Sequence, residues 1–166
     1  MPQITKETLT NRVHSLCKAF STSAPLPVLL SNFTTSPEPT ALEHGLPSLA
    51  PFLGRSFTGH EGLTTYFGLL ADYLAIEKMD FESDNKWVVD ETTMAVSLRG
   101  NARFKWKETG QAWDETFAYR IGLQEEGVGG EVKVVVYEVW ADTGAAYLAR
   151  IGALEGVLKG GKVQKE

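Results

Sequence analysis

Three long runs of alternating apolar and polar residues in the second half of the chain restrict the fold most strongly. They are residues 92–106 (TTMAVSLRGNARFKW), 111–123 (QAWDETFAYRIGL) and 131–142 (EVKVVVYEVWAD). Successive side chains of a strand point to opposite faces, so each run predicts a strand with one apolar face. The glycine-containing segments between them, 107–110 and 125–130, are typical of turns. The runs therefore predict antiparallel strands that need a cover on one face.

Segments with helical periodicity are expected to cover this apolar face. Apolar side chains recur at helical spacing in residues 5–20 and 61–75, and shorter helices are predicted at 25–33 and 143–158. We expect residues 41–63 to form a loop. Helices followed by antiparallel strands predict an α+β fold, a curved antiparallel sheet with the N-terminal helices packed on its concave face.

The chain shows no repeat, linker or low-complexity segment. Its 166 residues fit one compact domain, which we expect to span residues 1–166. The ordered core is predicted to cover residues 5–158. We expect the glycine- and lysine-rich tail, residues 159–166, to be frayed.

Composition narrows the class of protein. The net charge of −5 argues against nucleic-acid binding, which needs a concentrated basic surface. The single cysteine, Cys17, forms no internal disulfide, and His44 and His60 do not have the spacing of metal ligands, so we expect no metal. The first twenty residues contain no apolar stretch typical of a secretory leader, so we expect no leader, and no apolar run reaches about 20 residues. We therefore expect a soluble cytoplasmic protein without a membrane partner.

Three segments resemble the SnoaL-like branch of the nuclear transport factor two-like (NTF2-like) superfamily, which includes ketosteroid isomerases and scytalone dehydratases. They are residues 46–67 (LPSLAPFLGRSFTGHEGLTTYF), 100–123 (GNARFKWKETGQAWDETFAYRIGL) and 134–150 (VVVYEVWADTGAAYLAR). Their order and spacing are similar to the family over roughly residues 5–150. The resemblance implies a cone-shaped α+β fold with a deep, mostly apolar pocket. It also implies that a few polar residues in the pocket act as acid and base, without a cofactor.

His44 is the first candidate catalytic residue. In the ketosteroid isomerases that the chain resembles, the catalytic carboxylate lies in the corresponding segment before the third helix. Here that segment offers Glu43 and His44. Imidazole is the best general base near neutral pH, which makes His44 a candidate catalytic base; the alternative is a loop histidine in solvent or in a structural hydrogen bond. His60, at the start of the predicted helix, is interpreted as structural.

Glu138 is the second candidate. Strict alternation places it on one strand face with Val132, Val134, Val136 and Trp140. A carboxyl on such a face has to be paired, protonated or at a wet pocket, and burial would raise its pKa and suit it to general acid work. The alternative is that this face is solvated, or that Glu138 pairs with an arginine across the sheet.

Asp142 is the third candidate. SnoaL-like cyclases use an aspartate on a late strand as acid and base, and the resemblance allows either Glu138 or Asp142 to take that role. A structural alternative is that Asp142 caps the terminal helix.

Five further residues are predicted to contact a ligand: Tyr66, Trp113, Glu115, Tyr119 and Trp140. Aromatic residues most often serve packing, yet a tyrosine hydroxyl in an apolar pocket is able to polarise a carbonyl. Tyr66, Tyr119 and Tyr137 are the candidates for that role. Tyr137 and Glu138 point to opposite faces, so at most one of them lines the pocket.

The resulting hypothesis is a cofactor-free isomerase, cyclase or dehydratase that acts on a small apolar, polyketide- or terpenoid-like molecule. The alternative is a ligand-binding or dimerising module without activity. A third hypothesis, an epoxide hydrolase, rests on the resemblance of Asp114 and Arg99 to part of an Asp-Arg-Asp set. We also expect a homodimer, because the outward-facing side chains of the long strands are less polar than those of a sheet face in contact with water usually are.

Overall fold

The computed structural model describes residues 3–161, so residues 162–166 of the predicted frayed tail lie outside the description. The elements in chain order are α1 (Lys6–Ser21), α2 (Leu26–Leu30), β1 (Thr40–His44), β2 (Ser56–Thr58), α3 (Gly59–Tyr73), β3 (Leu74–Phe81), the 3-10 helix η1 (Asp84–Lys86), β4 (Val88–Asp90), β5 (Ala95–Trp106), β6 (Ala112–Glu125), β7 (Val132–Trp140), α4 (Thr143–Arg150) and α5 (Leu154–Leu158). None of the described helices has the length and apolar character needed to cross a membrane.

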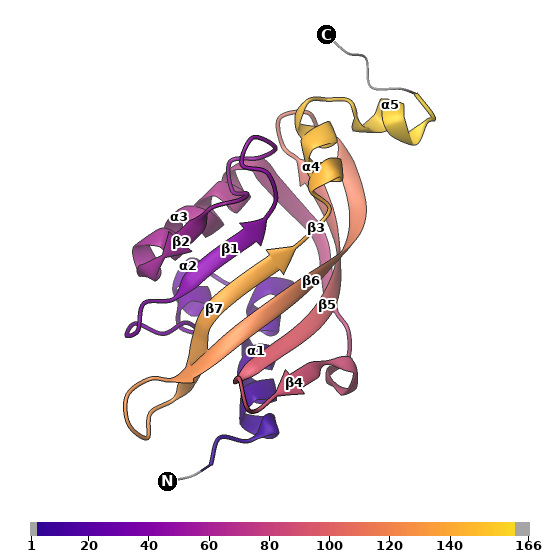
Figure 1. Ribbon diagram of the computed structural model, residues 1–166. Helices are drawn as coiled ribbons and strands as arrows, with labels where there is room; N and C mark the ends of the chain where they lie inside the picture. The colour runs from indigo at the N-terminus through magenta and orange to yellow at the C-terminus, as the bar shows by residue number, and fades with distance from the viewer. Residues whose placement is uncertain (1–2, 162–166) are drawn as a thin grey trace.

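One curved, unclosed sheet organises the fold (Figure 1). Its strand order is β2-β1-β7-β6-β5-β3, and β4 pairs with β5. The α+β class is confirmed, and α1, α2 and α3 lie on the concave side of the sheet, behind it in Figure 1. The three predicted long strands are β5, β6 and β7, each antiparallel to its neighbour in the sequence.

Two expectations about the N-terminal half are corrected. The expected loop at 41–63 contains β1 and β2, and β1 runs parallel to β7, so the sheet is mixed rather than purely antiparallel. These strands are too short for a period to be recognised, and each residue of β1 pairs with one that lies 96 positions further along the chain, as Thr40 does with Val136. Long-range pairing of this kind leaves no local pattern.

The helices follow the predicted patterns with shifted ends. Thr5 caps α1, its hydroxyl accepting from the backbone N–H of Thr8, and the apolar stripe of α1 is buried. The single helix expected at 143–158 is divided into α4 and α5. Gly152 lies between them at φ +75°, a left-handed conformation that interrupts a helix.

A β-bulge in β7 changes which side chains face the helices. Gly122 of β6 pairs with Val136, but the next residue, Leu123, pairs with Val134. Val135 is therefore an extra residue without a partner in the ladder. Such a bulge reverses the parity of all residues that follow it.

The burial pattern of β7 follows the bulge. Val132 and Val134 are buried before it, whereas Tyr137 and Val139 are buried after it. Glu138 therefore lies on the opposite face from Val132 and Val134, and the prediction that it shares their face is wrong. Three successive valines conceal the bulge in the sequence, because each of them suits either face.

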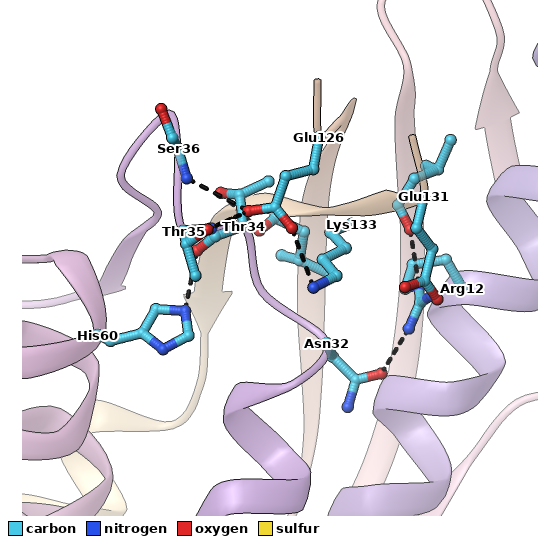
Figure 2. Close-up of polar contacts among 11 residues, drawn as sticks. Arg12, Asn32, Thr34, Thr35, Ser36, His60, Glu126, Glu131 and Lys133 are labelled. Atoms are coloured by element: carbon cyan, nitrogen blue, oxygen red, sulfur yellow. Dashed lines mark hydrogen bonds and ion pairs between the residues drawn. The ribbon is translucent and has the colours of Figure 1, made fainter. Parts of the chain in front are cut away.

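A carboxylate anchors the segment that joins α2 to β1 (Figure 2). Glu126, at the end of the β6–β7 hairpin, accepts hydrogen bonds from the backbone N–H of Thr35, from the Thr35 hydroxyl at 2.5 Å and from the backbone N–H of Ser36 at 3.3 Å. Lys133 lies 3.0 Å from its other oxygen. The bonds from Thr35 and the ion pair with Lys133 lower the pKa of Glu126 to about 2.

The Glu126 anchor predicts a pH-dependent contribution to stability. The folded-state pKa is below the usual value of 4.5, so the stabilisation is present above pH 4.5 and is lost as the pH falls toward 2. Thermal unfolding of wild type and Glu126→Gln should differ at pH 6, with the variant less stable, and should converge toward pH 2. A difference that stays constant over this range would contradict the assignment.

Candidate active site

A cavity of about 380 Å³ lies between the concave face of the sheet and helices α1, α2 and α3. Most of its wall is apolar, with side chains such as Phe20, Leu70, Met79, Phe104 and Phe117. Few polar groups interrupt this wall, and they are concentrated on β1, β6, β7 and α3. A largely apolar cavity with a few convergent polar groups is the usual form of a small-molecule site.

Glu43 of β1 places a carboxyl in this wall. The residue is only 7% exposed, and its Oε2 accepts a hydrogen bond of 2.8 Å from the hydroxyl of Tyr66 on α3. Its Oε1 accepts no hydrogen bond from residues 3–161. Burial raises the pKa of Glu43 to about 7, against the opposing effect of the Tyr66 bond, and the charge of Glu115 raises it further.

Three buried tyrosines line the cavity with Glu43. Tyr66 bonds to it directly, the rings of Tyr66 and Tyr137 are 6.2 Å apart, and those of Tyr137 and Tyr119 are 5.0 Å apart. Burial raises the pKa of each hydroxyl above its ordinary value. The three phenols therefore stay protonated at neutral pH and remain able to donate hydrogen bonds.

Glu115 of β6 supplies a second carboxyl. Its Oε2 accepts from the indole Nε1 of Trp113 at 2.7 Å and from the backbone N–H of Asp142 at 3.3 Å. Burial raises the pKa of Glu115, and the two hydrogen bonds oppose this effect. Four of the residues predicted from sequence to bind a ligand, Tyr66, Trp113, Glu115 and Tyr119, lie on the cavity wall.

His44 and Glu138 lie together on the outer face of the sheet, away from the cavity. The Nε2 of His44 is 3.1 Å from the Oε1 of Glu138, and Arg120 lies 3.7 Å from the other oxygen. The His44 ring stacks on Trp140 with 4.3 Å between ring centres. The structure thus brings His44 and Glu138 into contact as a pair, but their predicted placement in the pocket is corrected.

The other predicted residues have structural positions. Asp142 is the N-cap of α4, its carboxylate accepting from the backbone N–H of Ala145 at 2.9 Å. Trp140 is 43% exposed on the outer face. His60, in the first turn of α3, donates from Nε2 to the carbonyl of Thr34 at 2.9 Å, as Figure 2 shows.

The pair behind the epoxide-hydrolase hypothesis is not formed. Asp114 accepts from Arg103 at 2.8 Å, and Arg99 instead donates to Glu82 at 3.1 and 3.2 Å. Both pairs are on the exposed side of the sheet. Within residues 3–161, no group of three or more His, Cys, Asp or Glu side chains is placed to hold a metal ion.

Glu43, and not its neighbour His44, lies in the cavity wall. Adjacent residues of a strand point to opposite faces, so only one of Glu43 and His44 can reach the cavity. The pairing of Ala41 with Tyr137 and of Glu43 with Val139 places Glu43 on the inner face. No local pattern in a five-residue strand distinguishes the two alternatives.

Comparison with protein-family models finds no match, and no curated protein matches the chain. Solved structures do match. An NTF2-like protein of Burkholderia xenovorans LB400 has a TM-score of 0.66 at 16% identity, covering 88% of this chain and 98% of its own. The BvnE pinacolase of Penicillium brevicompactum has a TM-score of 0.62 at 16% identity, covering 93% and 98%.

A ketosteroid isomerase-like protein of Erwinia carotovora atroseptica matches with a TM-score of 0.60 at 12% identity, covering 82% of this chain and 95% of its own. At such identities the likeness is one of fold. It confirms the NTF2-like architecture that the sequence resemblance implied. The predicted homodimer stays a prediction, since the structure is that of a single chain.

The buried carboxyl of Glu43 predicts a stability cost at high pH. An unfolded glutamate ionises near pH 4.5 and the folded one near 7, so the free energy of unfolding falls as the pH rises between these values. Glu43→Gln keeps an oxygen that accepts from Tyr66 but carries no charge. Its stability relative to wild type should increase over this range by up to about 3 kcal/mol at pH 8.

Urea unfolding of both proteins at pH 4.5 and pH 8 measures this change. Glu108→Gln, which alters an exposed carboxyl in the β5–β6 turn, is the matched control and should show no such trend. A constant difference between Glu43→Gln and wild type at the two pH values would contradict the raised pKa.

Proposed function

We propose that this chain, which has the NTF2-like fold, is a cofactor-independent acid–base enzyme of the isomerase, cyclase or dehydratase type that acts on a small apolar molecule. The observation that carries the proposal is the Glu43 carboxyl, which is buried in the wall of an apolar cavity and has one oxygen that accepts no hydrogen bond from residues 3–161. The fold alone does not imply an activity, so the proposal rests on this site.

Glu43 is suited to moving a proton in both directions. A group whose pKa of about 7 is close to the working pH is present in both protonation states, which is the condition for efficient general acid–base catalysis. Ionised Glu43 would take a proton from a carbon beside a carbonyl group. The protonated carboxyl would then return it to another carbon, completing an isomerisation without an external reactant.

The tyrosines would stabilise the charge that this step creates. When the C–H bond breaks, its electron pair moves onto the carbonyl oxygen. A protonated phenol next to that oxygen stabilises the enolate, and the low dielectric of the cavity strengthens the interaction. Tyr119 and Tyr137 are the available donors, because the hydroxyl of Tyr66 is already directed to Glu43.

Glu115 extends the range of reactions open to this site. Its raised pKa favours the protonated form more than in an exposed glutamate. A protonated Glu115 would donate to a departing hydroxyl while Glu43 removes the proton, which gives a dehydration. Two carboxyls with different hydrogen-bond partners are a common basis for separate acid and base roles.

Proton exchange at carbon tests the role of Glu43. Wild type in D₂O should accelerate the exchange of the protons beside the carbonyl of α-tetralone, a compact bicyclic ketone, followed by NMR. Glu43→Gln should lower the catalysed rate by roughly 10²- to 10⁴-fold, the usual contribution of a positioned base. Glu138→Gln, on the outer face, should leave the rate unchanged. Equal rates for wild type and Glu43→Gln would overturn the assignment.

Tyr66→Phe tests whether the Tyr66 hydroxyl lowers the pKa of Glu43. The hydroxyl of Tyr66 stabilises the ionised carboxyl and so lowers the pKa of Glu43. Removing the hydroxyl should therefore move the rise of the exchange rate with pH to higher pH, while the rate at the plateau changes less. Tyr73→Phe, a tyrosine stacked on Trp106 and absent from the cavity wall, is the matched control. A profile that does not move would contradict the coupling.

A further inference from the structure

The cavity wall has an uneven charge composition. Two carboxyls, those of Glu43 and Glu115, contribute to it, and among the described residues that line it there is no lysine, arginine or histidine. The basic side chains of the neighbouring strands face outward, where they pair with other acids. Examples are Arg99 with Glu82 and Lys105 with Glu77. No described basic side chain in the wall compensates the two carboxyls.

Each carboxyl also keeps one oxygen available. Tyr66 occupies Oε2 of Glu43, and Trp113 and the backbone of Asp142 both occupy Oε2 of Glu115. The Oε1 atoms of both residues accept no hydrogen bond from residues 3–161. Each Oε1 is therefore an acceptor that a donor carried by a ligand in the cavity can reach, and a hydrogen bond to a charged group is stronger in apolar surroundings than in water.

Aromatic rings line the same cavity as the two carboxyls. Phe67, Phe117, Tyr119 and Tyr137 line the same cavity. The face of an aromatic ring carries partial negative charge and attracts a cation, most strongly where water is excluded. Carboxylates and ring faces therefore favour the same kind of ligand group.

We propose that the cavity selects apolar molecules that carry a basic nitrogen, with the protonated amine next to Glu43 and Glu115, and that it rejects molecules that carry a carboxylate. The inference deepens the proposed function and rests on it, because it assigns the substrate class of the same cavity. An ammonium group supplies the missing donor and the missing positive charge together. A ligand carboxylate would instead place a further negative charge beside these two acidic groups in a medium of low dielectric.

Three ligands with one skeleton test the charge preference. They are anthracen-9-ylmethanamine, anthracen-9-ylmethanol and anthracene-9-carboxylate, titrated into the wild-type protein and followed by anthracene fluorescence. The measurement is made at pH 8, where the amine is protonated and Glu43 is mostly ionised. The amine should bind at least about tenfold tighter than the alcohol, and the carboxylate at least about tenfold weaker, each step corresponding to one favourable or unfavourable ion pair.

Variants assign the preference to the two carboxyls. Glu115→Gln and Glu43→Gln should each reduce the ratio of amine to alcohol affinity, while Glu138→Gln, on the outer face, should keep it. The wild-type order of affinities decides the question even if a variant does not fold. Equal affinities for the three ligands, no binding by any of them, or a preference unchanged in both cavity variants would each overturn the inference.

The failure of this inference is distinguishable from failure of the proposed function. Equal affinities together with exchange that depends on Glu43 would remove the charge preference and leave the acid–base role in place. The predicted order of affinities without any catalysed proton exchange of α-tetralone would instead support an amine-binding cavity and overturn the proposed enzymatic activity.

Discussion

The parallel pairing of β1 with β7 is the constraint on which the site depends. It carries Glu43 to the inner face of the sheet, opposite α3, where the Tyr66 hydroxyl meets the carboxyl at 2.8 Å. The bulge at Val135 sets the face of the partner strand, so that Tyr137 points inward beside Glu43. Without the pairing, the cavity would lose the Glu43 carboxyl. Without the bulge, Glu138 would take the place of Tyr137 in the wall.

A buried carboxyl in the wall of an apolar cavity, such as Glu43, contributes little to stability. Its desolvation is unfavourable, and the single bond from Tyr66 offsets only part of that cost. The same desolvation brings its pKa near neutrality, where a carboxyl can both accept and release a proton. The outer face shows the contrast, because the partly exposed Glu138 has both His44 and Arg120 as partners. The Glu138 carboxylate on the outer face thus has charged partners, whereas the Glu43 carboxyl on the inner face has only the Tyr66 hydroxyl.

Much of the site could be predicted because long strands keep their period. The alternation of residues 111–123 placed Trp113, Glu115 and Tyr119 on one face, and they line the cavity together. Prediction failed in β1 and in the second half of β7. A five-residue strand gives too few positions to decide between Glu43 and His44, and a run of three valines hides a bulge. In both places the outcome depends on a partner strand that is remote in sequence.

The sequence by itself determined the α+β class, the three long strands and the apolar faces of the helices, because these follow from periodicity within continuous segments. The likeness to the NTF2-like fold came instead from the resemblance of three segments to that superfamily. Tertiary structure alone decided which polar side chains share the cavity. Glu43 and Glu115 come from strands about seventy residues apart, and a one-residue shift of parity moves a side chain through the sheet to its other face. Local patterns determine the helices and strands, whereas pairing between distant strands determines which polar side chains line the cavity.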